Sequence, residues 1–175
     1  LSFAELYSEA TGLLGALQSR GMRPGDELVI FTRSHRKFVV SFWAAILGGI
    51  VPVPVAVGIS DEHRFKLFRI LRQLDRGTLY TETELLERLQ RFASEQALPD
   101  ISSILAESSV TLSQIEATDP GEVVEADPWR TAFIQYSSGS TSAPKGVCLT
   151  HRNLTTNIRA IVEGAGWHDD DRSLS

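Results

Sequence analysis

The sequence predicts an α/β protein in which helices flank a doubly wound, mostly parallel sheet. Short apolar runs rich in β-branched residues alternate along the chain with longer segments whose apolar residues recur at helical spacing. Strands that are separated by helices favour parallel pairing, because the chain must cross over between neighbouring strands. The 175 residues, 42% of them hydrophobic, are also enough to bury a core. One α/β unit is therefore expected.

Capping and breaking residues define the elements in the first third of the chain. A helix begins at Ser2, whose hydroxyl forms a capping box with Glu5. The short apolar run at 27–31 predicts a buried strand. Apolar residues surround most of the next helix, 36–47, so we expect it to be largely buried. The run at 50–55 predicts a further strand. Its two prolines lack a backbone donor, so they favour a sheet edge, or a strand cut short at the second proline, over a central position.

The middle of the chain continues the alternation of helices and strands. A helix is expected at 61–74, a short strand at 78–80 and another helix at 82–97. Residues 99–128 are less periodic, and only a short strand at 109–112 is predicted within them.

Composition and charge exclude several classes of protein. The net charge of -5 disfavours a nucleic-acid surface, since phosphate backbones select clustered cations. The arginines and lysine between residues 64 and 76 have acidic neighbours and predict a solvated helix face. No segment resembles a signal peptide, and glycines and prolines interrupt the longest apolar stretch, 38–57. We therefore expect a soluble, cytoplasmic protein that binds neither nucleic acid nor a membrane.

The single cysteine, Cys148, lies in the apolar run 147–149. It cannot form an internal disulfide, which fits a reducing compartment. The apolar run predicts a buried strand, so we interpret Cys148 as a core residue. As a nucleophile it would need a positioned base, for which the nearby His151 is the only obvious candidate.

The most informative segment is the loop 137–146, which follows an apolar strand at 131–136 and precedes a second apolar strand and a helix. Small side chains let backbone N–H groups approach a polyphosphate, hydroxyls donate hydrogen bonds to it, and a cation balances its charge. Here Gly139 and Gly146 provide access, and Lys145 provides the cation. The candidate phosphate-binding residues are Ser137, Ser138, Gly139, Ser140, Thr141, Ser142, Lys145 and Gly146.

Two known nucleotide motifs do not fit this loop. Gly139 and Lys145 do not match a glycine, four residues and then Gly-Lys-Ser/Thr, and the dinucleotide fingerprint is not matched either. A flexible Ser/Gly linker is the other interpretation. Linkers seldom lie between two apolar strands or end in Pro-Lys-Gly-Val, so the residues favour phosphate binding over a linker.

Residues 136–153 read Tyr-Ser-Ser-Gly-Ser-Thr-Ser-Ala-Pro-Lys-Gly-Val-Cys-Leu-Thr-His-Arg-Asn and resemble the signature of the adenylate-forming superfamily. This superfamily comprises acyl-CoA synthetases, peptide-synthetase adenylation domains, luciferases and fatty acyl-AMP ligases. Residues 1–6 are similar to its early helix, 21–26 to its Gly-x-x-Pro-Gly-Asp turn, and 42–54 to its helix-glycine-strand-proline segment. Residues 52–63 and the Tyr-Ser-Ser start of the loop are most similar to fatty acyl-AMP ligases and related loading domains of polyketide and peptide synthetases.

The resemblance implies a two-step reaction that uses ATP and Mg²⁺. A fatty acid carboxylate attacks the α-phosphate of ATP, giving an acyl-adenylate and pyrophosphate, and the thiol of an acyl carrier protein or of coenzyme A then accepts the acyl group. The loop holds the β- and γ-phosphates, and Lys145 supports the departure of pyrophosphate. The chain departs from the family at Ser142, where glycine is common, and a positive φ there would strain the loop.

The resemblance also implies that residues 1–175 are an N-terminal subdomain fragment of the AMP-binding domain, with the C-terminal domain absent. The family's adenine and acyl pockets, Mg²⁺-binding glutamate and catalytic lysine have no counterpart in this sequence. The fragment alone is expected to hold no catalytic residue and to be inactive, and the remainder of the same enzyme is its expected partner. Other interpretations are an acyl-CoA synthetase, an amino-acid adenylation domain, and a non-catalytic structural or interaction module.

Polar residues after the loop are interpreted as structural. Thr150 or Asn153 is expected to cap the helix that follows, and His151 is not expected to be catalytic. His168 and the acidic residues at 169–171 predict a solvated turn. No metal ligand is predicted.

Overall fold

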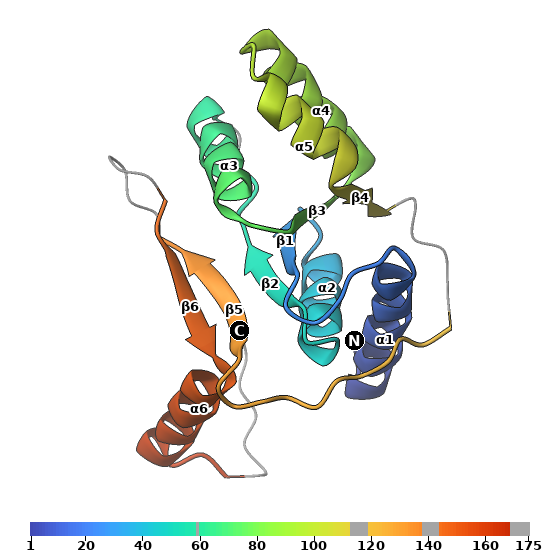
Figure 1. The fold of residues 1–175 in the computed structure, drawn as a ribbon. Coiled ribbons are helices and arrows are strands. Elements are labelled where there is room, and N and C mark those ends of the chain that lie inside the picture. The colour runs from blue at the N-terminus through green and yellow to red at the C-terminus, as the bar shows by residue number, and fades with distance from the viewer. Residues whose placement is uncertain (59, 113–118, 138–143, 169–175) are drawn as a thin grey trace.

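A computed structural model describes residues 1–58, 60–112, 119–137 and 144–168 (Figure 1). Helices and strands alternate through the first part of the chain, as predicted, and a hairpin and a helix follow. The elements are α1 (Phe3–Ser19), β1 (Glu27–Phe31), α2 (His35–Leu47), β2 (Val51–Pro54), α3 (Asp61–Gln73), β3 (Gly77–Thr81), α4 (Thr83–Glu95), α5 (Pro99–Glu107), β4 (Ser109–Thr111), β5 (Thr131–Tyr136), β6 (Gly146–Thr150) and α6 (His151–Ala165).

The central sheet has four parallel strands in the order β2-β1-β3-β4. The predicted edge position of β2 is confirmed. The N–H groups of Val51 and Val55 donate to β1 and its flank, at the carbonyls of Asp26 (2.8 Å) and Ile30 (3.0 Å). Successive N–H groups of a strand point to opposite sides. The two prolines of β2 therefore occupy the positions whose N–H groups would point away from β1, out of the edge of the sheet.

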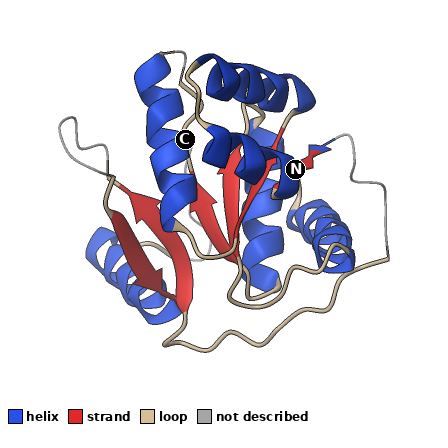
Figure 2. Ribbon diagram, turned by 45° about the horizontal axis from the view of Figure 1, so that its top comes forward, coloured by secondary structure: helices blue, strands red, loops and turns tan. Residues whose placement is uncertain are grey.

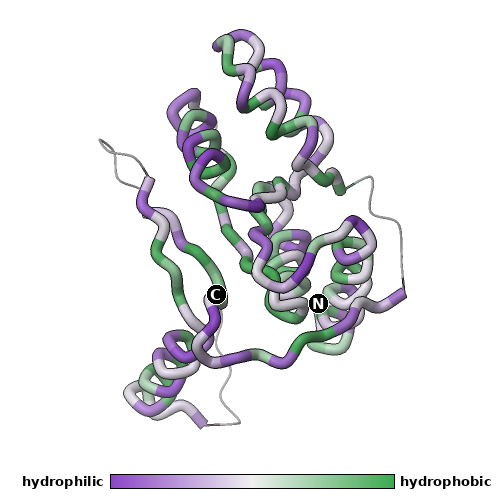
Figure 3. Tube along the Cα trace, viewed as in Figure 1, coloured by the Kyte–Doolittle hydropathy of each residue, from purple (hydrophilic) through white to green (hydrophobic). Residues whose placement is uncertain are grey.

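Helices cover both faces of this sheet, which confirms the doubly wound prediction (Figure 2). Alternate strand residues supply the two cores: Val29 and Leu79 pack with α3, α4 and α5, whereas Leu28 and Tyr80 pack with α1 and α2. The hydropathy of the chain follows this arrangement, with hydrophobic residues concentrated along the central strands (Figure 3).

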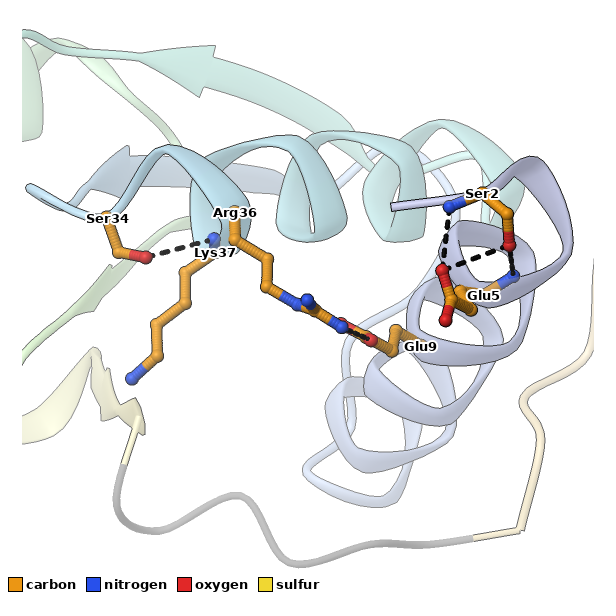
Figure 4. Close-up of polar contacts among 6 residues, drawn as sticks. All are labelled: Ser2, Glu5, Glu9, Ser34, Arg36 and Lys37. Carbon is orange, nitrogen blue, oxygen red and sulfur yellow. Dashed lines mark hydrogen bonds and ion pairs between the residues drawn. The ribbon is translucent and has the colours of Figure 1, made fainter.

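The first helix begins as predicted. Ser2 Oγ accepts a hydrogen bond from the Glu5 N–H, and the Glu5 carboxylate accepts one from the Ser2 N–H at 2.7 Å (Figure 4). These hydrogen bonds lower the pKa of Glu5. One turn further along, Glu9 forms an ion pair with Arg36 and so connects α1 to α2. Both charges are substantially exposed, so the pair orients the helices more than it stabilises them.

Three details differ from the sequence-based expectation. Helix α2 is only partly buried, because it packs on the sheet with one side and its outer side chains Phe38, Val39 and Trp43 are 36%, 36% and 45% exposed. The strand expected at 78–80 is longer, because β3 begins at Gly77 and ends at Thr81. Helix α5 was not predicted, since only Ile101 and Leu105 of its nine residues are buried and they leave almost no periodic signal.

The described chain before β5 runs back along α1 and α2. Gln18 exchanges two hydrogen bonds with the backbone of Glu122, at 2.9 and 2.8 Å, and the Val124 N–H donates to the Leu47 carbonyl at 2.8 Å. Gly121 lies so close to α1 that a Cβ on it would meet the helix backbone. These contacts return the chain to the β2 edge, where β5 begins.

Replacing Gly121 with alanine is expected to lower the free energy of unfolding by about 1–3 kcal/mol. The added Cβ would lie 2.5 Å from the Gly15 nitrogen and 2.6 Å from Leu14 Cγ, so the segment must move away from α1. A Cβ added at Gly12, inside α1, would meet nothing within 4 Å. Alanine there is expected to raise the free energy of unfolding by about 0.5–1 kcal/mol. Urea unfolding of both variants checks this, and shifts of the same sign would contradict the packing argument.

Candidate functional site

The predicted phosphate loop joins the two strands of a hairpin. Strands β5 and β6 pair antiparallel in a sheet of their own, and β5 packs beside β2 at the edge of the central sheet (Figure 1). Ile134 and Tyr136 of β5 are partly buried against the core that α3, α4 and α5 cover. The strand that leads into the loop is therefore anchored on the main body of the protein.

The two ends of the loop are joined to each other. The Ser137 N–H donates to the Lys145 carbonyl at 3.0 Å, just beyond the last pair of the ladder. Pro144 is buried, whereas the Lys145 side chain is exposed and forms no ion pair with the described residues. The Lys145 side chain is therefore accessible at the end of the hairpin. The candidates Ser138, Gly139, Ser140, Thr141 and Ser142 lie outside the described residues.

Gly146 has a structural role that sequence reasoning missed. It pairs with Tyr136 across the ladder, and a Cβ on Gly146 would lie 3.0 Å from both Tyr136 Cζ and Ile134 Cγ2. Any side chain at this position would push Tyr136 and Ile134 away by a few tenths of an ångström, so glycine allows the closest packing. The signal was present in the sequence as an aromatic residue before the loop and a glycine after it, but only the strand register brings them together.

The predicted burial of Cys148 is wrong. Cys148 lies opposite Ile134 in the middle of β6 and is exposed. An apolar run is buried only if something covers it, and within the described chain β6 pairs with β5 alone. Its neighbour Val147 is likewise 53% exposed. The hairpin therefore presents an apolar outer surface.

Helix α6 is capped as predicted. Thr150 Oγ1 accepts from the Asn153 N–H at 3.1 Å, and Asn153 Oδ1 accepts from the Thr150 N–H at 2.9 Å, which completes a capping box. The next two N–H groups, of His151 and Arg152, donate to backbone carbonyls of the turn before β5. The N–H groups of the first turn of α6 thus donate hydrogen bonds to other protein groups, and His151 contributes its backbone N–H to this arrangement.

Nothing in the described part of the chain forms a metal centre: no three His, Cys, Asp or Glu side chains there are close enough to hold an ion. His168 is described, but the acidic residues 169–171 beside it are not. No described helix is both long enough and apolar enough to cross a bilayer.

Helix α6 carries an exposed apolar stripe. None of its residues is buried, and Ile158, Ile161 and Val162 are all exposed. Trp167 follows directly after the helix and is also exposed. This stripe and the outer surface of β6 belong to the same C-terminal part of the chain (Figure 1).

The whole chain matches one protein family. The sequence profile described as AMP-binding enzyme matches residues 1–175. A long-chain-fatty-acid–AMP ligase, FadD32, of Mycobacterium marinum is 27% identical over 169 residues, covering 97% of this chain and 26% of the relative. The FadD32 of Mycolicibacterium smegmatis is 28% identical over 177 residues, covering 100% of this chain and 27% of the relative. The chain thus spans about a quarter of the length of these curated relatives.

Solved structures share the fold. The McyG A-PCP structure with phenylalanyl-adenylate superposes with a TM-score of 0.85 at 24% identity, covering 98% of this chain and 27% of that one. A fatty acid AMP ligase from Legionella pneumophila superposes with a TM-score of 0.79 at 21% identity, covering 97% of this chain and 28% of that one. The architecture described above is therefore that of the corresponding quarter of these proteins.

Proposed function

This chain belongs to the family of AMP-binding enzymes, and from that premise we propose that the whole protein is an ATP-dependent fatty acyl-AMP ligase. The enzyme joins a fatty acid carboxylate to the α-phosphate of ATP and releases pyrophosphate. The acyl group then passes to the thiol of a carrier protein or of coenzyme A. The observation that carries the proposal is the match over nearly the whole chain to curated long-chain-fatty-acid–AMP ligases.

The phosphate groups of ATP bind at the β5–β6 hairpin. The exposed Lys145, held at its backbone by Ser137, supports this placement, because its charge meets the pyrophosphate as it leaves. In this proposal Mg²⁺ accompanies ATP. The proposed phosphate-binding residues are Ser137, Ser138, Gly139, Ser140, Thr141, Ser142, Lys145 and Gly146.

Residues 1–175 form an N-terminal subdomain of the AMP-binding domain in this proposal. The exposed apolar stripe of α6 and the outer surface of β6 support it, because exposed apolar side chains that gather on one surface mark a site that other protein covers. The remainder of the same enzyme, including the C-terminal domain, packs there and completes the catalytic site. The 175-residue chain alone is expected to be inactive. The proposed location of the enzyme is the cytoplasm, which fits the single free cysteine.

Amino-acid adenylation in a peptide synthetase is the second candidate function. The McyG A-PCP structure with phenylalanyl-adenylate, which shares the fold, motivates this alternative. Acyl-CoA synthesis shares the same first step and differs in the accepting thiol.

Mass spectrometry of the reaction products tests these proposals. The full-length protein that contains residues 1–175 is supplied with Mg-ATP, fatty acids, amino acids and coenzyme A. Acyl-AMP that persists in the presence of coenzyme A is the expected product. Acyl-CoA would instead identify a CoA ligase, and aminoacyl-AMP a peptide-synthetase domain. The absence of any adenylate would overturn the enzymatic proposal and favour a non-catalytic module.

A further inference from the structure

Tyr136 and Gly146 meet at the neck of the hairpin. Their backbones form the last pair of the β5–β6 ladder. A Cβ on Gly146 would lie 3.0 Å from Cζ and 3.2 Å from Cε1 of Tyr136, so the aromatic ring lies directly over the glycine backbone. A methyl group at these distances would push its neighbours away by a few tenths of an ångström. The ring therefore rests on the residue that immediately follows Lys145.

The same ring is held by the main core. Tyr136 is partly buried against the cluster that includes Val29, Phe31 and Val53 of the central sheet. In the part of the chain that the structure describes, β5 forms no ladder with β2, so side-chain packing fixes the position of the hairpin end. This burial raises the pKa of the Tyr136 hydroxyl, with a smaller contribution from Cys148, and the phenol stays neutral at physiological pH.

We propose that Tyr136 is a positioning residue for Lys145. The core holds the ring, the ring holds Gly146, and Gly146 fixes the backbone from which Lys145 extends. The hydrogen bond from the Ser137 N–H to the Lys145 carbonyl, 3.0 Å long, connects the same two segments a second time. The aromatic ring is required and the hydroxyl is not, since the contacts with Gly146 are made by ring carbons.

Trypsin provides a direct readout of the Lys145 backbone. Cleavage after Lys145 in the full-length protein requires the neck to open, so its rate reports the population of the open form. Tyr136→Ala is expected to accelerate this cleavage by about tenfold or more, and Tyr136→Phe to leave it unchanged. Rates are divided by the rate of cleavage after Lys37 on α2 in the same digest, which removes any effect of global unfolding.

Phe133→Ala is the matched control. Phe133 is another large aromatic residue of β5, but it packs on Phe42 with ring centroids 5.8 Å apart and lies away from the neck. Its removal is expected to leave the normalised cleavage after Lys145 unchanged. The proposal is overturned if Tyr136→Ala is cleaved as slowly as the wild type, or if Phe133→Ala accelerates cleavage to the same extent.

The kinetic consequence rests on the proposed function. If ATP binds at this hairpin, Tyr136→Ala is expected to lower kcat for adenylate formation by about tenfold with a smaller change in KM for the acid, and Tyr136→Phe to restore the wild-type rate. Equal kcat in Tyr136→Ala and the wild type would overturn the catalytic importance of the position. A wild-type enzyme that makes no adenylate would refute the proposed function, while the trypsin experiment would still decide the role of Tyr136.

Discussion

Replacing Lys145 with alanine in the full-length enzyme is expected to slow acyl-adenylate formation by about 10²–10³-fold. The reason is electrostatic. The proposed role of Lys145 is to stabilise the charge that develops on pyrophosphate as the bond to the α-phosphate breaks, and a preorganised cation does so without reorganisation. Because Lys145 is exposed and forms no ion pair with the described residues, its loss leaves no buried group unpaired. Pre-steady-state measurement of pyrophosphate release checks the rate.

Two variants sharpen this experiment. Lys37→Ala removes an exposed lysine of α2 and is expected to leave the rate unchanged (Figure 4). Lys145→Arg keeps the charge but changes its shape and reach, and an intermediate rate is expected. A thermal unfolding midpoint close to that of the wild type would show that Lys145→Ala leaves the fold intact. Adenylation at the wild-type rate by this variant would refute the assigned role of Lys145.

The parallel sheet could be predicted because local sequence carries the information that determines it. The run 27–31 is short and apolar, as a strand buried on both faces must be. The prolines of β2 exclude a central position, and the structure places β2 at the edge. Ser2 and Glu5 lie only three residues apart, so their capping box is a local contact as well. In each case the decisive interaction lies within a few residues or follows from backbone chemistry.

Contacts between distant segments could not be predicted in this way. Cys148 belongs to an apolar run, but the run is buried only if another segment covers β6. No local sequence pattern identifies such a segment. The outer side of α2, including Trp43, was misjudged for the same reason. At the candidate site, the residue types of the loop predicted phosphate binding. The contact of Tyr136 with Gly146 could be found only from the register of the β5–β6 ladder.

The largest effect on stability is expected from Phe68→Ala, which should lower the free energy of unfolding of this chain by about 3–5 kcal/mol. Phe68 of α3 is 0% exposed and packs against Phe92 of α4, with ring centroids 6.0 Å apart. It lies in the core that also contains Val29 and Leu79 of the sheet. Truncation removes apolar contact and leaves a cavity that rigid strands cannot fill by moving. Urea unfolding followed by circular dichroism measures the change.

Phe3→Ala is the matched control for this prediction, because the same side chain is 94% exposed at the start of α1. Its truncation is expected to change the free energy of unfolding by less than about 0.5 kcal/mol. If Phe68→Ala costs as little as Phe3→Ala, the α3–α4 face of the sheet is loosely packed and the prediction is wrong. That face also supports Tyr136, so the cost of Phe68→Ala bears on the anchoring of the hairpin.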